Sequence, residues 1–319
     1  MADDTAIIAT DRRKDRLYKI LHEKGAVPRY VSRRLFPLFQ KAGLHITADH
    51  FYEIIPNTAE IAKTYDSSAR PCHGIDFHGP EAEEWLLRIL GAYAPVFYDE
   101  AAKEGYYEAN SYFRGADALT LYCVLRDLKP RRVIEIGHGF STRVVLSALR
   151  QNGTESGTRP SFLSVDPYAR FVPNSAAEAA VDFEVHGKPL QESIELVTGS
   201  LQAGDMLFVD STHVFKYGSD VEVYFDLLYP QLPAGVHVHV HDIFSPYHYP
   251  IEWMTHHKRF WNEQYYLENF LRFNDRFEVT LPLHMLMRQS EKVRAAFHSY
   301  LKGPDFLFVG QSMYLKRLG

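Results

Sequence analysis

Cysteine is almost missing from this chain of 319 residues, which contains only Cys72 and Cys123. Two cysteines are too few for a scaffold held by disulfides, so the sequence predicts a reducing environment. No apolar run approaches the roughly 18 residues that a membrane span requires. No apolar segment of a secretory signal follows the acidic first residues. We therefore expect a cytoplasmic protein with no membrane partner.

An excess of basic residues is also missing. The chain has 35 Lys and Arg against 40 Asp and Glu, for a net charge of -5. Nucleic-acid binding requires a dense basic surface that displaces counterions. The short basic clusters at residues 12–14 and 33–34 are typical of solvated helix faces. We expect no nucleic-acid partner.

Aromatic residues, by contrast, are abundant at 14%, with 20 Tyr and 21 Phe. Such residues often line pockets for small organic ligands, but they also build ordinary cores. Composition alone leaves both interpretations open.

The first third of the sequence shows helical spacing of apolar residues, interrupted by turn signals between residues 50 and 80. We expect residues 1–104 to form a mostly helical N-terminal cap or dimerisation arm, with a homodimer as one outcome. The helices expected up to residue 128 cover residues 12–24, 28–43, 81–90 and 117–128.

From residue 131 the pattern changes to short apolar strands that alternate with helices, which is typical of a parallel sheet covered on both faces. We therefore expect residues 105–319 to form a Rossmann-like α/β domain, in which the last two strands make an antiparallel edge pair. The expected strands are residues 131–136, 161–166, 183–186, 205–210, 235–241, 276–281 and 305–315, and the helices are residues 141–150, 218–229, 261–273 and 291–300.

The segment Val133 to Thr142 (VIEIGHGFST) stands between the first strand and its helix. Gly137 and Gly139 permit a tight turn and let a ligand lie against bare backbone. Ser141 or Thr142 can cap the helix, whose free N–H groups point toward the ligand. Glu135 can accept a hydrogen bond from the ammonium group of an amino-acid moiety. The segment therefore predicts a cofactor loop.

Asp166 is the next acidic residue at a strand end, and a carboxylate there suits the two hydroxyls of a ribose. An NAD site prefers Gly or Ala where Thr142 stands, because its helix must approach a pyrophosphate. S-adenosylmethionine (SAM) has no phosphate, and an acidic residue before the first glycine suits its methionine end. These residues favour SAM over NAD, and a turn without any ligand is the remaining alternative.

Together these residues resemble class I SAM-dependent methyltransferases, through Glu135–Thr142, Asp166 and the acidic strand end at Asp210. The resemblance covers residues 105–319 and implies SAM as cofactor. It also implies that the segment before the first strand folds over the cofactor, which makes Tyr107 and Asn110 candidate contacts, with packing as the alternative. The loop after the third strand would meet the adenine, with Leu190 and Gln191 as weaker candidates. Residues 306–315 look like the family's final strand.

Two polar groups follow the fourth and fifth strands, Asp210 with His213 and His241 with Asp242. Neighbouring parallel strands bring their carboxyl ends together, where ligands of open α/β sheets bind. In one interpretation Asp210, His241 and Asp242 hold Mg²⁺ or Mn²⁺, which lowers the pKa of an acceptor hydroxyl. In the other no metal binds, and His213 or His241 is the general base, oriented by a carboxylate.

Some natural-product and sugar O-methyltransferases resemble this pattern, with D-x-x-H followed by two acids, and use a metal. This chain has His241-Asp242 at the second place, which leaves the metal open. The alternating His237 and His239 lie earlier in the strand, and we expect them to be buried, hydrogen-bonded packing residues.

The long aromatic loop after the fifth strand favours a lid over the acceptor. Tyr247, His248 and Trp261 are its candidate pocket residues, with capping and packing as the alternative for the segment that starts at Trp261.

We therefore expect a methyltransferase for a small-molecule acceptor, with O-methylation first and N-methylation next. Two further alternatives are a SAM enzyme of other chemistry, either hydroxylation or a displacement that releases methylthioadenosine, and a SAM-binding protein without catalysis. Ionisable residues gathered at two strand ends favour an enzyme.

Overall fold

The computed structural model describes residues 26–50, 52–169, 180–301 and 303–319. The helix expected over residues 12–24 lies outside the described residues. Contacts divide the chain into two compact units, one of residues 1–66 with 250–260 and one of residues 67–249 with 261–319.

The smaller unit contains three described helices, α2 (Ala26–Lys41), α3 (Thr58–Thr64) and α12 (Ile251–Thr255). The helix predicted over residues 28–43 is confirmed as α2, which continues through Pro37 and is followed by Gly43 with φ of +76°. The side chain of Asn57 begins α3 by accepting from the N–H groups of Ala59 and Glu60. Helices α3 and α12 pack against each other.

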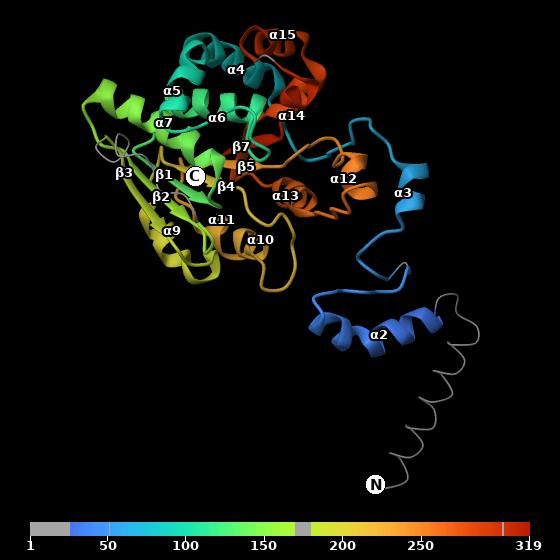
Figure 1. Cartoon of the computed structure of the whole chain (residues 1–319). Coiled ribbons are helices and arrows are strands. Elements are labelled where there is room, and N and C mark those ends of the chain that lie inside the picture. The colour runs from blue at the N-terminus through green and yellow to red at the C-terminus, as the bar shows by residue number, and fades with distance from the viewer. Residues whose placement is uncertain (1–25, 51, 170–179, 302) are drawn as a thin grey trace. The chain divides into compact units, whose positions relative to one another are not determined.

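The larger unit is built on one sheet of seven strands in the order β3-β2-β1-β4-β5-β7-β6 (Figure 1). The first five strands are parallel, and β7 is antiparallel to both of its neighbours. The predicted Rossmann-like sheet with a final antiparallel pair is confirmed. The strands are β1 (Arg132–Ile136), β2 (Ser161–Val165), β3 (Asp182–His186), β4 (Met206–Val209), β5 (His237–His241), β6 (Phe277–Pro282) and β7 (Ser312–Arg317).

Helices cover both faces of the sheet because neighbouring side chains of a strand point to opposite sides. Val133 and Phe208 belong to the apolar core on one face, and Ile134 and Leu207 belong to the core on the other. The first face is covered by α4 (Gly79–Tyr93), α5 (Phe97–Lys103), α6 (Gly115–Leu128), α7 (Phe140–Ser156), α14 (Leu283–Gln289) and α15 (Glu291–Tyr300), and the second by α9 (Ile194–Ser200), α10 (Asp220–Val223), α11 (Tyr229–Gln231) and α13 (Glu263–Leu271).

Two expectations about elements need correction. The strand expected over residues 305–315 begins only at Ser312, because Asp305–Phe308 form a 3₁₀ turn and Gly310 takes a φ of +61°. The helix expected over residues 218–229 is divided into α10, a π-helical turn at Tyr224–Leu228, and α11. Helices α5, α9 and α14 were not anticipated.

The boundary expected at residue 104 also differs from the division between the units, which follows Asp66. Helices α4 and α5 precede that boundary but belong to the larger unit. Their apolar side chains Leu86, Ile89 and Phe97 are fully buried in the core that α6 and α7 share. Burial of these residues ties residues 67–104 to the sheet.

Candidate active site

The loop between β1 and α7 passes directly beneath the end of β4. Gly137 has φ of +99°, and a Cβ atom added there would lie 1.9 Å from the carbonyl oxygen of Asp210. The N–H of Gly137 donates to the carbonyl of Val165 at 3.0 Å, and the N–H of Asp210 donates to that of Ile136 at 2.9 Å. Only glycine fits this close approach between two strand ends.

Glu135 holds this loop by hydrogen bonds on the side that faces the protein interior. Its fully buried carboxylate accepts from the hydroxyls of Ser141 and Thr142 at 2.7 Å and of Ser164 at 3.0 Å. Burial raises its pKa to about 8, although the three hydroxyls oppose that shift. Glu135 therefore fixes the loop from inside the protein, and its expected contact with a cofactor ammonium stays a prediction.

The start of α7 is shaped by the residues that the sequence proposed as its cap. The Thr142 hydroxyl accepts from the N–H of Gly139 at 3.0 Å while it donates to Glu135. Gly139 has extended backbone, and a Cβ atom there would meet nothing within 4 Å. The loop therefore needs a glycine at residue 137 for its fold, while Gly139 leaves open space beside the backbone.

Asp166 lies at the end of β2 and faces the same loop. One carboxylate oxygen accepts from the N–H of His138 at 2.9 Å, and the other accepts from the N–H of Tyr168 at 2.6 Å. Each oxygen keeps a further lone pair, so the group can still accept hydroxyls.

Two cavities of about 490 and 400 Å³ meet at this loop and share Gly137, His138, Tyr168 and Asp210. We call them together the cofactor cleft. The larger cavity is also lined by Asp166, Leu190 and Gln191, and the smaller by Tyr112, Phe113, Phe140, Ser141 and Arg143. Of the predicted cofactor residues, these two linings contain Gly137, Gly139, Ser141, Asp166, Leu190, Gln191 and Asp210.

Tyr107 and Asn110 make contacts within the protein, and their contact with a cofactor stays a prediction. The Asn110 amide donates to the carbonyls of Tyr107 and Phe113 and accepts from the N–H groups of Tyr112 and Phe113. These four bonds use its hydrogen-bonding capacity, so Asn110 braces a turn. Tyr107 is exposed and its ring meets the edge of Phe140 at 5.0 Å. The turn also stacks the ring of Tyr112 parallel to the ring of Phe140. The sequence did not single out this contact.

A buried polar cluster lies where β4 and β5 end. Asp210 Oδ1 is 3.2 Å from His241 Nδ1 and 3.3 Å from His213 Nε2, and Asp242 Oδ2 is 3.4 Å from His213 Nε2. One ligand atom from each of Asp210, His241 and Asp242 lies within 4.8 Å of the others. The predicted meeting of these strand ends is confirmed. His213 and Asp242 both have φ of +57°, a conformation that costs energy outside glycine.

Two acidic residues complete the cluster and were missed by sequence reasoning. Glu263, at the start of α13, lies 2.9 Å from His213 Nδ1. Asp117, in the first turn of α6, lies 4.0 Å from His241 Nε2 and accepts from the Gln311 N–H and the Ser312 hydroxyl. Both residues open helices, where an acidic residue is common, so their local sequence carried no signal of a site.

The cluster determines the charge of both histidines. Burial alone would lower the pKa of His241, but Asp242, Asp210 and Asp117 raise it to about 10. Burial is likewise outweighed at His213, whose pKa is raised well above 6.5 by Asp210, Glu263 and Asp242. In turn, the charges and hydrogen bonds of the two imidazoles hold the pKa of Asp210 below its usual value despite burial.

His239 differs from its neighbour on β5. It is fully buried, as expected, but neither ring nitrogen has a hydrogen-bond partner among the residues that the structure describes. Its ring is stacked between Phe208 at 4.3 Å and Tyr314 at 4.2 Å, and burial lowers its pKa well below 6.5. The expected hydrogen bonding is therefore wrong, and His239 packs as a neutral aromatic ring. His237 is partly buried at the start of the strand.

The three predicted acceptor residues lie in different surroundings. The Trp261 ring packs on His213 at 4.3 Å, beside the polar cluster. Tyr247 is buried, its hydroxyl accepts from Gln289 Nε2 at 3.2 Å, and its carbonyl accepts from Gln264 at 2.7 Å. His248 Nδ1 lies 3.1 Å from the Tyr265 hydroxyl. Their contact with an acceptor stays a prediction.

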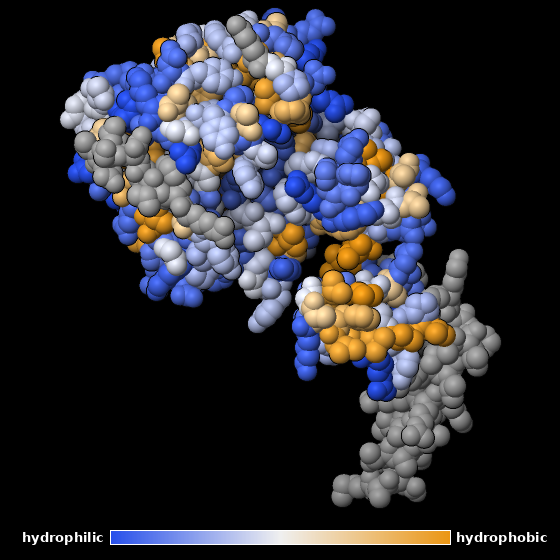
Figure 2. All heavy atoms as spheres, viewed as in Figure 1, coloured by the Kyte–Doolittle hydropathy of each residue, from blue (hydrophilic) through white to orange (hydrophobic). Residues whose placement is uncertain are grey.

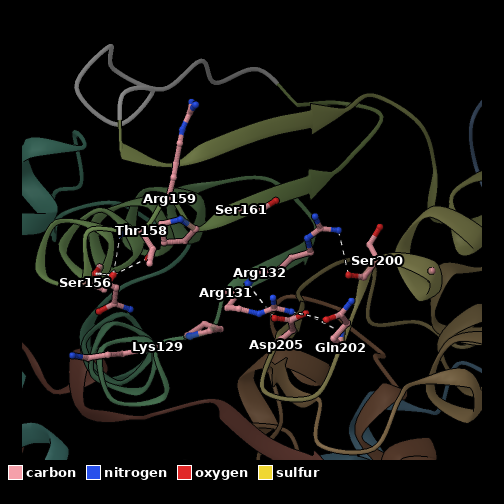
Figure 3. Close-up of a pocket in the computed structure, with 14 residues that line it drawn as sticks. Lys129, Arg131, Arg132, Ser156, Thr158, Arg159, Ser161, Ser200, Gln202 and Asp205 are labelled. Carbon is pink, nitrogen blue, oxygen red and sulfur yellow. Dashed lines mark hydrogen bonds between the residues drawn. The ribbon is translucent and has the colours of Figure 1, made fainter.

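A separate cavity of about 650 Å³ lies at the opposite end of the strands, where β1, β2 and β4 begin (Figure 3). It is lined by Lys129, Arg131, Arg132 and Arg159, and its carboxylate, Asp205, accepts from backbone N–H groups of Arg132 and Gln202. Figure 3 shows Arg159 extending away from Arg131 and Arg132. This cavity contains none of the residues predicted from the sequence, so we place the site at the carboxyl ends of the strands.

Comparison with known proteins agrees with this placement. Residues 134–243 match a family described as a methyltransferase domain. An uncharacterised protein of Archaeoglobus fulgidus is 32% identical over 107 residues, which make up 30% of this chain and 48% of that protein. The chain thus matches about half the length of this curated relative.

The matched segment begins within β1 and contains the cofactor loop, β4, β5 and, of the polar cluster, Asp210, His213, His241 and Asp242. This part of the chain is therefore similar to a methyltransferase domain. The solved structures include an SAH-bound methyltransferase of Podospora anserina at 18% identity and a TM-score of 0.36, covering 82% of this chain and 93% of that one.

Proposed function

We propose that this protein is a SAM-dependent methyltransferase that methylates a hydroxyl group of a small molecule with the help of a divalent cation. One observation carries the proposal: Asp210 lines both cavities of the cofactor cleft and also belongs to the buried polar cluster. The cofactor cleft, which would hold the methyl donor, and the polar cluster, which would activate the acceptor, therefore share the side chain of Asp210.

The residues of the cleft fit SAM. Asp166 keeps acceptor capacity for the ribose hydroxyls, and Leu190 and Gln191 line the same cavity and would adjoin the adenine. Ser141, Arg143 and the start of α7 line the other cavity, where N–H groups and a guanidinium suit the methionine carboxylate. When bound, SAM supplies a methyl group on a positively charged sulfur, so the protein has to align the acceptor and exclude water.

The polar cluster fits a divalent cation. It contains four acidic residues and two histidines, so the acids outnumber the bases by two. Asp210, His241 and Asp242 offer two carboxylates and one imidazole, a donor set that suits Mg²⁺ or Mn²⁺. A cation there would stabilise the ionised form of an acceptor hydroxyl near neutral pH.

The alternative of a histidine base without metal is less well supported. A general base needs an unprotonated nitrogen that faces the substrate. Both nitrogens of His213 face carboxylates, Glu263 on one side and Asp210 with Asp242 on the other. In the cluster without a cation, Asp242, Asp210 and Asp117 raise the pKa of His241 and hold a proton on it; a cation would replace that proton and leave the imidazole neutral and able to ligate. In this structure both histidines balance negative charge.

We test the proposal by titrating EDTA-treated protein with S-adenosylhomocysteine and, separately, with Mn²⁺ in a calorimeter. We expect the wild-type protein to bind both ligands. Asp242→Asn should weaken Mn²⁺ binding at least about tenfold, because one charged ligand is lost, while it leaves S-adenosylhomocysteine binding nearly unchanged. The matched control is Asp226→Asn, which removes an exposed acid away from the cluster.

The two parts of the proposal fail separately. If S-adenosylhomocysteine produces no heat, the assignment of the cofactor cleft is wrong. If Mn²⁺ does not bind, or binds equally to Asp242→Asn, the metal-assisted mechanism is wrong while SAM dependence stands. Transfer of a labelled methyl group to nitrogen, in a screen of small hydroxyl and amine compounds, would contradict O-methylation.

A further inference from the structure

Among the described residues, helix α2 presents a row of aliphatic side chains that remain exposed. Val27, Val31, Leu35 and Leu38 are 52%, 45%, 40% and 64% exposed. Their spacing of four, four and three residues places them on one face of the helix. Figure 2 shows apolar surface in this part of the chain, with polar residues beside it. Contiguous exposed apolar surface on a helix is typical of a binding surface.

The opposite side of α2 is occupied by contacts within the smaller unit. Phe36 stacks on His45 with ring centroids 5.5 Å apart. The Arg29 guanidinium lies 5.1 Å from the centre of the Tyr52 ring, and its Nε lies 3.9 Å from Glu53. These contacts lie on the side of α2 opposite the aliphatic row.

The charge of α2 is of one sign. The helix contains Arg29, Arg33, Arg34 and Lys41 and no acidic residue, so its 16 residues carry a formal charge of +4. The whole chain carries -5, which leaves -9 for the other residues. A basic helix with an aliphatic face is thus set in an otherwise acidic protein.

We propose that α2 binds an anionic lipid surface, lying flat with its aliphatic row in the boundary between headgroups and acyl chains. Helices with a strong apolar face, a basic polar face and low mean hydropathy bind membranes in this way. The lipid phosphates would supply the negative charge that the helix lacks. Two copies of α2 face to face would instead bring together Arg33, Arg34 and Lys41 of each copy, whereas Arg29 already lies beside Glu53, so the charges favour lipid over self-association.

This inference departs from the expectation of no membrane partner, which was drawn from the lack of a spanning segment. Among the described residues no helix is long and apolar enough to cross a bilayer. A helix that lies on the surface needs neither length nor an apolar circumference.

The test is co-flotation of the full chain with vesicles of phosphatidylcholine containing about 30% phosphatidylglycerol, and with phosphatidylcholine alone. We expect binding to the anionic vesicles that weakens with salt. Val31→Ser with Leu35→Ser should weaken binding at least about tenfold. Arg33→Gln with Arg34→Gln should remove the preference for the anionic vesicles.

Matched controls are Leu196→Ser with Leu227→Ser, two aliphatic residues of similar exposure in the larger unit, and Lys188→Gln with Lys292→Gln, two exposed cations. Both doubly substituted control proteins should bind vesicles as the wild type does.

Three results would overturn the proposal. The first is no flotation of the wild type. The second is equal flotation of the Val31→Ser/Leu35→Ser variant. The third is a wild-type protein that is a dimer in light scattering and does not bind vesicles, while the Val31→Ser/Leu35→Ser variant is a monomer. The aliphatic row would then bind a second copy of the chain. A fall in thermal stability of the variant without any vesicle binding by the wild type would show that the row packs within the chain.

Discussion

At the scale of single residues, the two glycines of the cofactor loop have unequal tasks. We predict that Gly137→Ala lowers the free energy of unfolding by at least about 2 kcal/mol and abolishes S-adenosylhomocysteine binding. The new methyl group would collide with the carbonyl oxygen of Asp210, and φ of +99° is strained for alanine. Urea denaturation and calorimetry measure the two effects.

Gly139→Ala is the matched control, because a Cβ atom there meets nothing within 4 Å and the backbone is extended. Its stability should stay within about 0.5 kcal/mol of the wild type. Equal stability of the Gly137→Ala and Gly139→Ala proteins would show that the approach of the loop to Asp210 is looser than the structure has it.

Glu135 provides a prediction about pH. Burial raises the pKa of this carboxyl group from 4.5 to about 8, so the folded protein holds its proton more tightly than the unfolded chain. The associated stability is fully present below about pH 4.5 and is lost as the pH rises through about 8. We expect the stability of the wild type relative to Glu135→Gln to fall by a few kcal/mol between about pH 5 and pH 8.

Urea midpoints of the two proteins across this range measure the difference. The exposed Glu195→Gln gives the background and should run parallel to the wild type. Parallel curves for wild type and Glu135→Gln would mean that Glu135 keeps an ordinary pKa.

Individual site residues were predictable where they directly follow an apolar strand. Asp210, His241 and Asp242 follow apolar strands, and parallel pairing brings such ends together, so their meeting could be predicted. Glu263 and Asp117 come from helices α13 and α6, whose docking depends on packing between elements distant in sequence. No local pattern encodes that docking.

At the scale of elements, Asp117 joins α6 to the start of β7. One oxygen of its carboxylate accepts from both the Gln311 N–H and the Ser312 hydroxyl. We predict that Asp117→Ala lowers the free energy of unfolding by about 2–4 kcal/mol, because the part-buried Gln311 N–H and the buried Ser312 hydroxyl lose their acceptor. Asp117→Asn keeps an oxygen at that place and should cost clearly less.

Thermal or urea unfolding of both variants separates this role from a general effect of burial. Equal losses for the Ala and Asn variants would show that the negative charge beside His241, and not the bonds to β7, stabilises the protein.

Elements with strong alternation or clear capping were predicted within a few residues, as β1, β2 and α15 show. The errors occurred where the backbone changes conformation without a change in composition. Residues 305–315 contain two apolar stretches, 306–309 and 313–315, yet Gly310 between them takes a positive φ and the strand begins only at Ser312. The π-helical turn at Tyr224–Leu228 likewise sits inside a continuous helical pattern. Apolar periodicity does not report such local irregularities.

At the scale of the whole molecule, the fold class followed from alternation of strands and helices, and the sheet order agreed with it. The division into units did not follow, because α4 and α5 resemble the helices before them in composition. Only their burial against α6 and α7 shows that they belong to the sheet.

The place of β7 has a consequence for biosynthesis. This strand is made after β6 but lies between β5 and β6, so β6 has no strand to pair with until residues 312–317 leave the ribosome. The β5 edge beside His241 stays open for the same period. A nascent chain can therefore assemble the parallel strands early but has to keep two strand edges unpaired until residue 317 has emerged. Unpaired edges invite association with other chains. Premature termination before Ser312 should thus yield aggregates and not a shortened enzyme.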